Sequence, residues 1–290
     1  MDEQLIQRLH GLIDRGEALL DRFERRADGA AMVDWQAPAF RWSRHDRLQP
    51  ISRVNTLPLS DLHGIAAQKD TLVANTRQFL NGQPANNALL WGARGTGKSS
   101  LIRALLHEFA DRGLRLVQVD ARDLVDLPDI APLLANRPER FIIFCDDLSF
   151  GDDDPGYKAL KSMLDGSLLA PPDNLLIYAT SNRRHLLPEY LDENRQARNV
   201  DGEIHHGDAV EEKLSLSERF GLWLSFYPFD QEAYLAIVRS HLDRLGQAVD
   251  GDASFRRAAL QWALARGVRS GRAARQFALH WLGQQPDEPA

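Results

Sequence analysis

The spacing of hydrophobic residues changes along this chain and predicts different structures in different parts. Near the N-terminus, apolar residues recur every three or four positions, which predicts an amphipathic helix over residues 4–26. From Asp61 onward, short apolar runs alternate with helical segments, which is typical of a parallel sheet covered by helices on both faces. Beyond Pro228 the pattern is entirely helical and predicts three helices, near residues 231–245, 254–265 and 271–282.

Five of the apolar runs are expected to be the strands of the sheet. They lie at residues 88–91, 114–119, 141–145, 175–179 and 222–226. The predicted fold class is therefore α/β, with a five-stranded parallel sheet, helices on both faces and a C-terminal all-α lid. We expect an N-terminal helix and extended strap over residues 1–60, an α/β domain over 61–228 and the helical lid over 229–290.

The segment before the α/β domain is rich in aromatic and basic residues. We expect its aromatic side chains to pack into the core of that domain, because exposed tryptophan is unusual in an acidic globular protein. These residues are Trp35, Phe40 and Trp42. Arginines such as Arg41 and Arg44 make the segment locally basic, so a nucleic-acid contact and a solvated loop both remain possible readings. The helix over residues 4–26 either packs on its own chain or docks on a partner or a membrane surface.

The most specific motif is a glycine-rich loop between an apolar strand and a helix. The loop fits the pattern GxxxxGK[ST], and in this context it predicts a nucleoside-triphosphate site. Its glycines allow the backbone N–H groups to turn toward phosphates, Lys98 would reach the β and γ phosphates, and Ser99 would hold Mg²⁺. The predicted nucleotide-binding residues are Gly92, Ala93, Arg94, Gly95, Thr96, Gly97, Lys98, Ser99 and Ser100.

Polar side chains follow two of the predicted strands at the same edge of the sheet. Asp146 and Asp147 end the strand over residues 141–145, and Asn182 follows the strand over residues 175–179. Parallel strands present ligands at their carboxyl ends, so Asp146 is expected to hold Mg²⁺ with Ser99. We expect Asp147 to orient the attacking water and Asn182 to hold that water against the γ phosphate.

Two arginines complete the predicted catalytic set. Arg219 lies just before the last strand, on the far side of the domain from its own loop, where it could serve a neighbouring subunit as an arginine finger. The alternative is a surface arginine in a salt bridge. Arg272 lies near the start of a lid helix, from which it could touch the γ phosphate and report its presence through closure of the lid.

Charge and cysteine content narrow the class of protein. The formal net charge is −6 and the pI is about 5.9, which argues against a protein whose whole surface binds DNA. A single cysteine excludes an internal disulfide and fits a reducing compartment. The sequence shows neither a secretion signal nor a membrane span, so we expect a cytoplasmic protein.

With these five elements in order, residues 61–283 resemble an AAA+ ATPase. Gly92 to Ser99 match its Walker A loop, Asp146 and Asp147 end its Walker B strand, and Asn182, Arg219 and Arg272 match sensor 1, the arginine finger and sensor 2. The resemblance implies ATP and Mg²⁺ as cofactors, hydrolysis to ADP and phosphate, and self-association through Arg219 acting in trans. It also implies an adenine contact around residues 61–65 and remodelling of a client protein.

Three segments further resemble an uncharacterised bacterial family of single-domain AAA+ proteins: LLWGARGTGKSS, FIIFCDDLSF and SLSERFGLWLSFYPF. One position departs from the wider pattern, since most active AAA+ members have glutamate where this chain has Asp147. Because aspartate is one methylene shorter, hydrolysis could be slow. Two alternatives therefore stay open beside the ATPase: an ATP-gated adaptor or loader that turns over slowly or not at all, and a nucleic-acid-associated remodeller.

Overall fold

The computed structural model describes residues 33–150, 154–165, 172–183, 186, 198–200, 203–205, 216–247 and 253–284. The helix expected over residues 4–26 lies outside the described residues. Two short strands, β7 (Arg198–Val200) and β8 (Glu203–His205), pair with each other in a separate antiparallel ribbon. Within the described part of the chain, no helix is long and apolar enough to cross a membrane.

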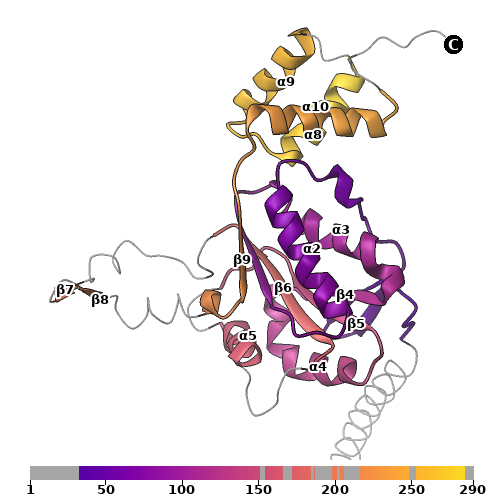
Figure 1. Ribbon diagram of the computed structural model, residues 1–290, viewed down its shortest axis with the longest axis vertical. Helices are drawn as coiled ribbons and strands as arrows, with labels where there is room; N and C mark the ends of the chain where they lie inside the picture. The colour runs from indigo at the N-terminus through magenta and orange to yellow at the C-terminus, as the bar shows by residue number, and fades with distance from the viewer. Residues whose placement is uncertain are drawn as a thin grey trace, which may run out of the picture.

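A seven-stranded sheet forms the centre of the molecule, in the order β2-β1-β4-β5-β6-β3-β9 (Figure 1). The five predicted strands are present and are all parallel to their neighbours. Their bounds are Ala88–Gly92 for β3, Leu114–Gln118 for β4, Arg140–Cys145 for β5, Leu175–Ser181 for β6 and Leu222–Phe226 for β9. The predicted α/β class with a parallel core sheet is confirmed.

The prediction of five strands was too low, because part of the segment predicted as a strap is a hairpin that extends the sheet. Strand β1 (Ala39–Ser43) pairs in parallel with β4, and β2 (Arg47–Ile51) pairs antiparallel with β1 at the edge. Short strands with Pro50 and several charges carry a weak strand signal, and Pro is tolerated only at an edge. The hairpin joins the sheet through the pairing of β1 with the distant β4, which no local pattern reveals.

The aromatic residues of this hairpin segment are anchored in the core, as expected. Phe40 is fully buried and Trp42 is nearly so. The ring of Trp35 lies 5.5 Å from that of Phe40 and 6.2 Å from that of Phe141 on β5, measured between centroids. The guanidinium of Arg137 covers the Trp35 ring at 4.4 Å. The hairpin is therefore part of the hydrophobic core.

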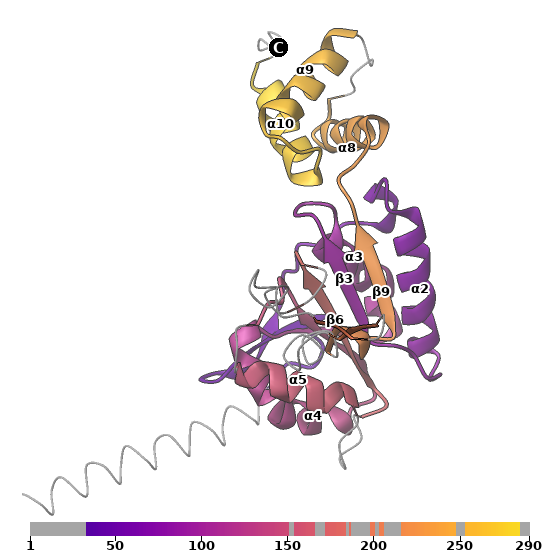
Figure 2. The same cartoon turned by 90° about the vertical axis from the view of Figure 1, so that its left-hand side faces the viewer.

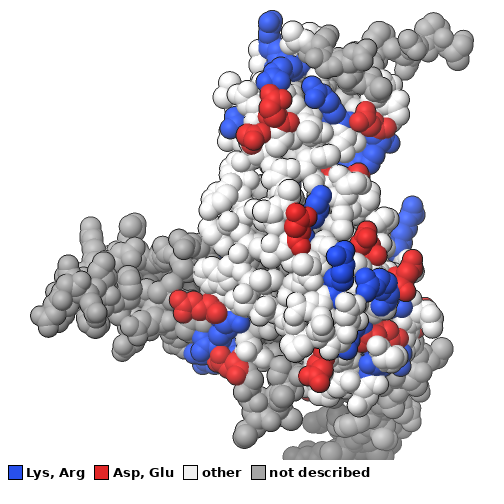
Figure 3. Space-filling model, viewed as in Figure 1, with Lys and Arg blue, Asp and Glu red and all other residues white. Residues whose placement is uncertain are grey.

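Two basic side chains of the hairpin form ion pairs with acidic residues of the same chain. Arg41 forms an ion pair with Asp120 at 2.9 Å, and Arg44 forms one with Asp126 at 3.2 Å. The indole N–H of Trp42 also donates to Asp126, at 3.0 Å. On the molecular face drawn in Figure 3, Lys and Arg are interspersed with Asp and Glu, so that face carries no continuous basic surface. These contacts weaken the interpretation of the hairpin as a nucleic-acid site.

Replacing Phe40 with alanine should destabilise the whole domain, because the fully buried ring belongs to one of the two hydrophobic clusters of the sheet. Truncating a buried phenylalanine costs about 3–5 kcal/mol of unfolding free energy. Denaturant unfolding followed by tryptophan fluorescence measures the change. Leu264→Ala is the control, since Leu264 is 80% exposed and its truncation should change stability little. An unchanged unfolding midpoint for Phe40→Ala would mean that the hairpin is dispensable to the fold.

Helices cover both faces of the sheet (Figure 2). Helices α2 (Ala66–Leu80) and α3 (Lys98–Phe109) lie on one face, and α4 (Leu127–Ala135) and α5 (Pro155–Asp165) lie on the other. Successive residues of a strand point to opposite faces, so Ile142 packs in the first of two buried clusters and Ile143 in the second. This two-sided burial explains the continuous apolar run of β5. Three single-turn helices, η1 (Leu59–Asp61), η2 (Ala110–Arg112) and η3 (Ala121–Asp126), connect the larger elements.

The C-terminal helices form a lid beyond the carboxyl ends of the strands, at the top of Figure 1. They are α8 (Gln231–Arg244), α9 (Ala253–Ala265) and α10 (Gly271–Leu282), close to the predicted ranges. Asp230 and Ser270 cap α8 and α10 by accepting backbone N–H hydrogen bonds. The backbone of Phe229, which links β9 to the lid, hydrogen-bonds Arg269 in both directions. The lid is thus fixed to its linker next to the start of α10.

Candidate functional site

The loop between β3 and α3 is shaped by three glycines with positive φ. The φ angles are 131° at Gly92, 73° at Gly95 and 103° at Gly97. A Cβ atom at Gly92 would lie 2.0 Å from the backbone oxygen of Phe226 on β9, so the close approach of the two strands requires glycine. Loop torsions of this kind allow consecutive N–H groups to converge on an anion. The loop leads directly into α3, whose N-terminus adds partial positive charge.

The side chain of Lys98 joins the loop to β6. Its ammonium donates to the backbone oxygens of Gly92 and Ala93, each at 2.8 Å, and to Oδ1 of Asn182 at 3.1 Å. Only 6% of Lys98 is exposed, and this burial lowers the pKa of its ammonium, while nearby carboxylates oppose the shift. Thr96 fixes the loop further by donating its hydroxyl to Ala93 at 2.7 Å. The cation is therefore held at the edge where the loop and β6 meet.

Asp146, at the carboxyl end of β5, accepts two hydroxyl hydrogen bonds on the same oxygen. Ser99 from the start of α3 donates to Oδ1 at 2.5 Å, and Thr180 from β6 donates to Oδ1 at 2.6 Å. Hydroxyl and carboxylate oxygens are ligands that Mg²⁺ prefers. The pair that the sequence predicted to hold a metal ion, Ser99 and Asp146, is thus in contact.

Asp147 adopts an uncommon backbone conformation and contacts the amide predicted to work with it. Its φ is 53°, in the left-handed region that aspartate tolerates better than most residues. Its backbone N–H donates to the Thr180 hydroxyl at 2.9 Å, and its Oδ1 accepts a hydrogen bond from Nδ2 of Asn182. The structure therefore brings together Lys98, Asp147 and Asn182, which are far apart in the sequence.

These groups line a cavity of about 860 Å³ that extends from the loop to the lid. It contains all the predicted site residues except Gly92, Ala93 and Arg219. Among its lining residues, cationic side chains outnumber carboxylates, six to three: Arg94, Lys98, Arg103, Arg244, Arg272 and Arg275 against Asp61, Asp146 and Asp147. Burial and nearby arginines lower the pKa of His241, another lining residue, to about 4, so it is neutral at pH 7. Such a lining suits a polyanion accompanied by a metal ion.

The lid contacts the glycine-rich loop directly at this cavity. The backbone N–H of Gly271, the first residue of α10, donates to the oxygen of Gly95 at 2.7 Å. A Cβ atom at Gly95 would lie 3.1 Å from the side chain of Ser270 and 3.3 Å from Cβ of Arg272. Arg272 therefore lies at the cavity, in the place the sequence predicted, and the lid is in contact with the loop.

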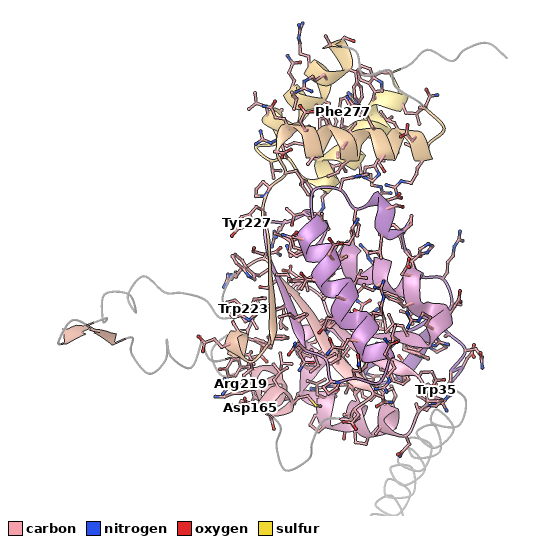
Figure 4. All side chains as sticks on the ribbon, in the orientation of Figure 1. Trp35, Asp165, Arg219, Trp223, Tyr227 and Phe277 are labelled. Carbon is pink, nitrogen blue, oxygen red and sulfur yellow. The ribbon has the colours of Figure 1, made fainter. Side chains whose placement is uncertain are left out.

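Arg219 lies away from this cavity. It belongs to the short turn before β9, and its Nε donates to Oδ1 of Asp165, the last residue of α5. Figure 4 shows the two side chains together at the end of the sheet opposite the lid. Arg219 is 25% exposed and Asp165 is 40% exposed. The geometry agrees with the expectation that Arg219 does not reach the phosphate loop of its own subunit.

Several residues of the site were not singled out from the sequence. They include three residues that line the cavity: Thr180, Arg275 and Arg244. Arg244 forms an ion pair with Asp61 at 3.2 Å. Thr180 comes two residues before Asn182 at the end of a buried strand, a position that could have drawn attention to it. The lid arginines could be found only from the packing of α8 and α10 over the loop. No cluster of three or more His, Cys, Asp and Glu side chains suited to a metal occurs among the described residues.

Comparison with solved structures identifies the fold. RuvB, the Holliday junction branch migration motor of Thermotoga maritima, matches with a TM-score of 0.51 and 15% identity, over 77% of this chain and 63% of that one. ORC1 of Aeropyrum pernix, in complex with DNA, matches with a TM-score of 0.50 and 16% identity, over 83% of this chain and 65% of that one. DnaA bound to AMPPCP and single-stranded DNA matches with a TM-score of 0.51 and 16% identity, over 77% of this chain and 63% of that one.

These likenesses establish an AAA+ fold, as the motifs predicted. The chain spans somewhat less than two thirds of the length of each of these proteins. Among curated proteins, no sequence relative is found. A model of the family described as "Protein of unknown function (DUF815)" matches residues 35–285, which is most of the chain. The chain belongs to this family, DUF815.

Proposed function

We propose that this protein binds ATP with Mg²⁺ and hydrolyses it in an assembly of identical subunits, coupling nucleotide state to the conformation of a partner. The observation that carries the proposal is the contact network at the carboxyl ends of β3, β5 and β6. It joins Lys98 to Asn182, Asn182 to Asp147, and Ser99 to Asp146. These are the side chains that phosphoryl transfer requires, within one cavity.

In this proposal the loop and the lid share the binding of the triphosphate. Backbone N–H groups of the loop and the N-terminus of α3 hold the phosphates, and Lys98 reaches the β and γ phosphates. Ser99 and Asp146 hold Mg²⁺, which neutralises phosphate charge when bound. Arg272 contacts the γ phosphate from the lid. Because Gly271 is hydrogen-bonded to Gly95, a conformational change of the loop on ATP binding moves the N-terminus of α10.

Hydrolysis needs groups from two subunits. Asp147 orients and deprotonates the attacking water, and Asn182 positions that water through its amide. Arg219 enters the site of the neighbouring subunit and stabilises charge on the transferred phosphoryl group. Since Arg219 is outside its own cavity, a single subunit has an incomplete site. The proposal therefore includes self-association.

The basic chemical claim is tested by phosphate release from ATP, with and without Mg²⁺. Asp147→Asn removes the carboxylate charge and keeps the size of the side chain, and asparagine also tolerates positive φ. We expect ATP affinity to be unchanged and kcat to fall about 100-fold, the lower part of the range for general-base catalysis. Equal turnover by the variant and the wild type would contradict the role of Asp147.

A second candidate, the ATP-gated adaptor with slow turnover, is favoured by the side chain of Asp147, which is one methylene shorter than the glutamate of most active AAA+ members. Asp147→Glu distinguishes the two. The ATPase proposal expects lower turnover, because glutamate is less tolerant of a φ of 53° and its extra methylene displaces the carboxylate. A clear acceleration by Asp147→Glu would favour the adaptor and direct attention to a docking partner.

A nucleic-acid-associated role has less support. ORC1 and DnaA were solved with DNA, and DnaA also with a nucleotide analogue, which agrees with nucleotide binding by this fold. In this chain, however, two arginines of the hairpin, Arg41 and Arg44, are paired with Asp120 and Asp126. We therefore propose a client protein as the partner. Cys145 is the only cysteine of the sequence and can form no disulfide within the chain, which fits the cytoplasmic location that we propose.

A further inference from the structure

We propose that Thr180 is a positioning residue that sets both acidic side chains of the proposed ATPase site. The inference rests on the proposed function, because it assigns Asp146 to the metal ion and Asp147 to the attacking water. Thr180 belongs to β6, borders the cavity and is 1% exposed, and its hydroxyl is engaged by Asp146 and Asp147. Its role must be exercised through its contacts.

The hydroxyl group of Thr180 connects the two aspartates. It donates to Oδ1 of Asp146 at 2.6 Å and accepts the backbone N–H of Asp147 at 2.9 Å. A hydroxyl has one proton to donate, so its direction is fixed once the Asp147 N–H occupies a lone pair. Because the acceptor is an ionised carboxylate, the bond to Asp146 is of the stronger, charge-assisted kind.

The backbone of Thr180 holds the same turn from its other side. Its carbonyl oxygen accepts the N–H of Leu148 at 2.6 Å. Asp147, between these two hydrogen bonds, has a φ of 53°. A non-glycine residue in this region is strained and persists only where its surroundings hold it. The side chain and main chain of Thr180 thus hold the turn that aims the Asp147 carboxylate.

The position of Thr180 is itself fixed by the sheet. Its strand lies between β5 and β3, and Thr180 pairs with Leu90 while its neighbour Ala179 pairs with Cys145. Ser99 donates to the same Oδ1 atom of Asp146 that Thr180 binds. A continuous path therefore runs from the start of α3 through Asp146 and Thr180 to the turn at Asp147. Loss of the hydroxyl should disturb metal binding and water positioning together.

The test compares Thr180→Ser with Thr180→Ala, which both remove the γ-methyl group and differ only in the hydroxyl. Thr180→Val, which keeps the branched shape, is the third variant. We expect Thr180→Ala and Thr180→Val to raise the Mg²⁺ concentration for half-maximal ATP turnover and to lower kcat, each by about 10–100-fold, as for groups that orient metal ligands. Thr180→Ser should remain within a few-fold of the wild type, and ATP affinity without Mg²⁺ should be the same in all.

A merely structural role for Thr180 predicts another pattern. Thr180→Ser would then lose as much activity as Thr180→Ala, or all variants would lose ATP affinity in proportion to their loss of thermal stability. Either result would overturn the inference, as would wild-type Mg²⁺ dependence in Thr180→Ala. If Thr180→Val does not fold, the Ser and Ala pair still decides. Failure of the wild type to bind and hydrolyse ATP would instead overturn the proposed function, and the inference with it.

Discussion

Lys98→Ala is expected to abolish measurable ATP turnover. The ammonium is buried at the edge of the loop, where its three donors bind oxygens of Gly92, Ala93 and Asn182, and phosphate oxygens would replace two of these acceptors when ATP binds. Losing two charge-assisted hydrogen bonds of about 2 kcal/mol each corresponds to about a 1000-fold loss in kcat/KM. Isothermal titration with ATP and a phosphate-release assay measure binding and turnover separately.

Arg77→Ala is the matched control for this variant. Arg77 is an exposed cation on α2 and does not line the cavity, so its removal lowers the net charge equally without touching the proposed site. We expect its ATP affinity and turnover to be those of the wild type. Normal ATP affinity in Lys98→Ala would remove the main support for nucleotide binding at this loop.

Arg219→Ala is expected to leave ATP binding nearly normal and to lower kcat by about 1000-fold or more. An arginine finger contributes 10³–10⁵-fold to kcat in related chemistry, because it stabilises charge that develops only in the transition state. Arg219 is outside the cavity of its own subunit, so its loss should not weaken the nucleotide contacts. Single-turnover hydrolysis and ATP titration measure the two effects.

Asp165→Ala distinguishes this role from a structural ion pair. If Arg219 only stabilises the fold through Asp165, both variants should lose stability and activity to a similar degree. If Arg219 acts on a neighbour, Asp165→Ala keeps the finger and should retain most of the turnover. Lys158→Ala, at an exposed position on α5, controls for the loss of one positive charge in Arg219→Ala. Equal losses in Arg219→Ala and Asp165→Ala would exclude the finger.

The core of the site was predictable because it is local in sequence. A strand, a loop and a helix in immediate succession define the phosphate loop from Gly92 to Ser99. The five core strands were recognisable as apolar runs, since strands buried on both faces carry few polar residues. Asp146 and Asn182 could then be brought together by one rule, that parallel strands end at the same edge of the sheet.

What the sequence did not reveal depends on tertiary contacts. Strand β1 pairs with β4, whose partner residues lie 77 positions later in the chain, as in Phe40 and Val117, and β2 joins the sheet only through β1. The ion pair of Arg219 with Asp165 depends on how α5 ends beside the turn before β9. The role of Thr180 could not be predicted for another reason. Threonine is a common residue in strands, and only the hydrogen bonds of its hydroxyl to Asp146 and Asp147 distinguish it.

Mixing Lys98→Ala with Arg219→Ala tests whether Arg219 of one subunit completes the ATPase site of its neighbour. The first variant keeps Arg219 but has a defective loop, and the second keeps the loop but lacks the finger. We expect each variant alone to be nearly inactive. We expect the mixture to hydrolyse ATP, with turnover per subunit rising with total protein concentration. A mixture as inactive as its components, at concentrations where the wild type hydrolyses ATP, would contradict a site completed by the neighbouring subunit.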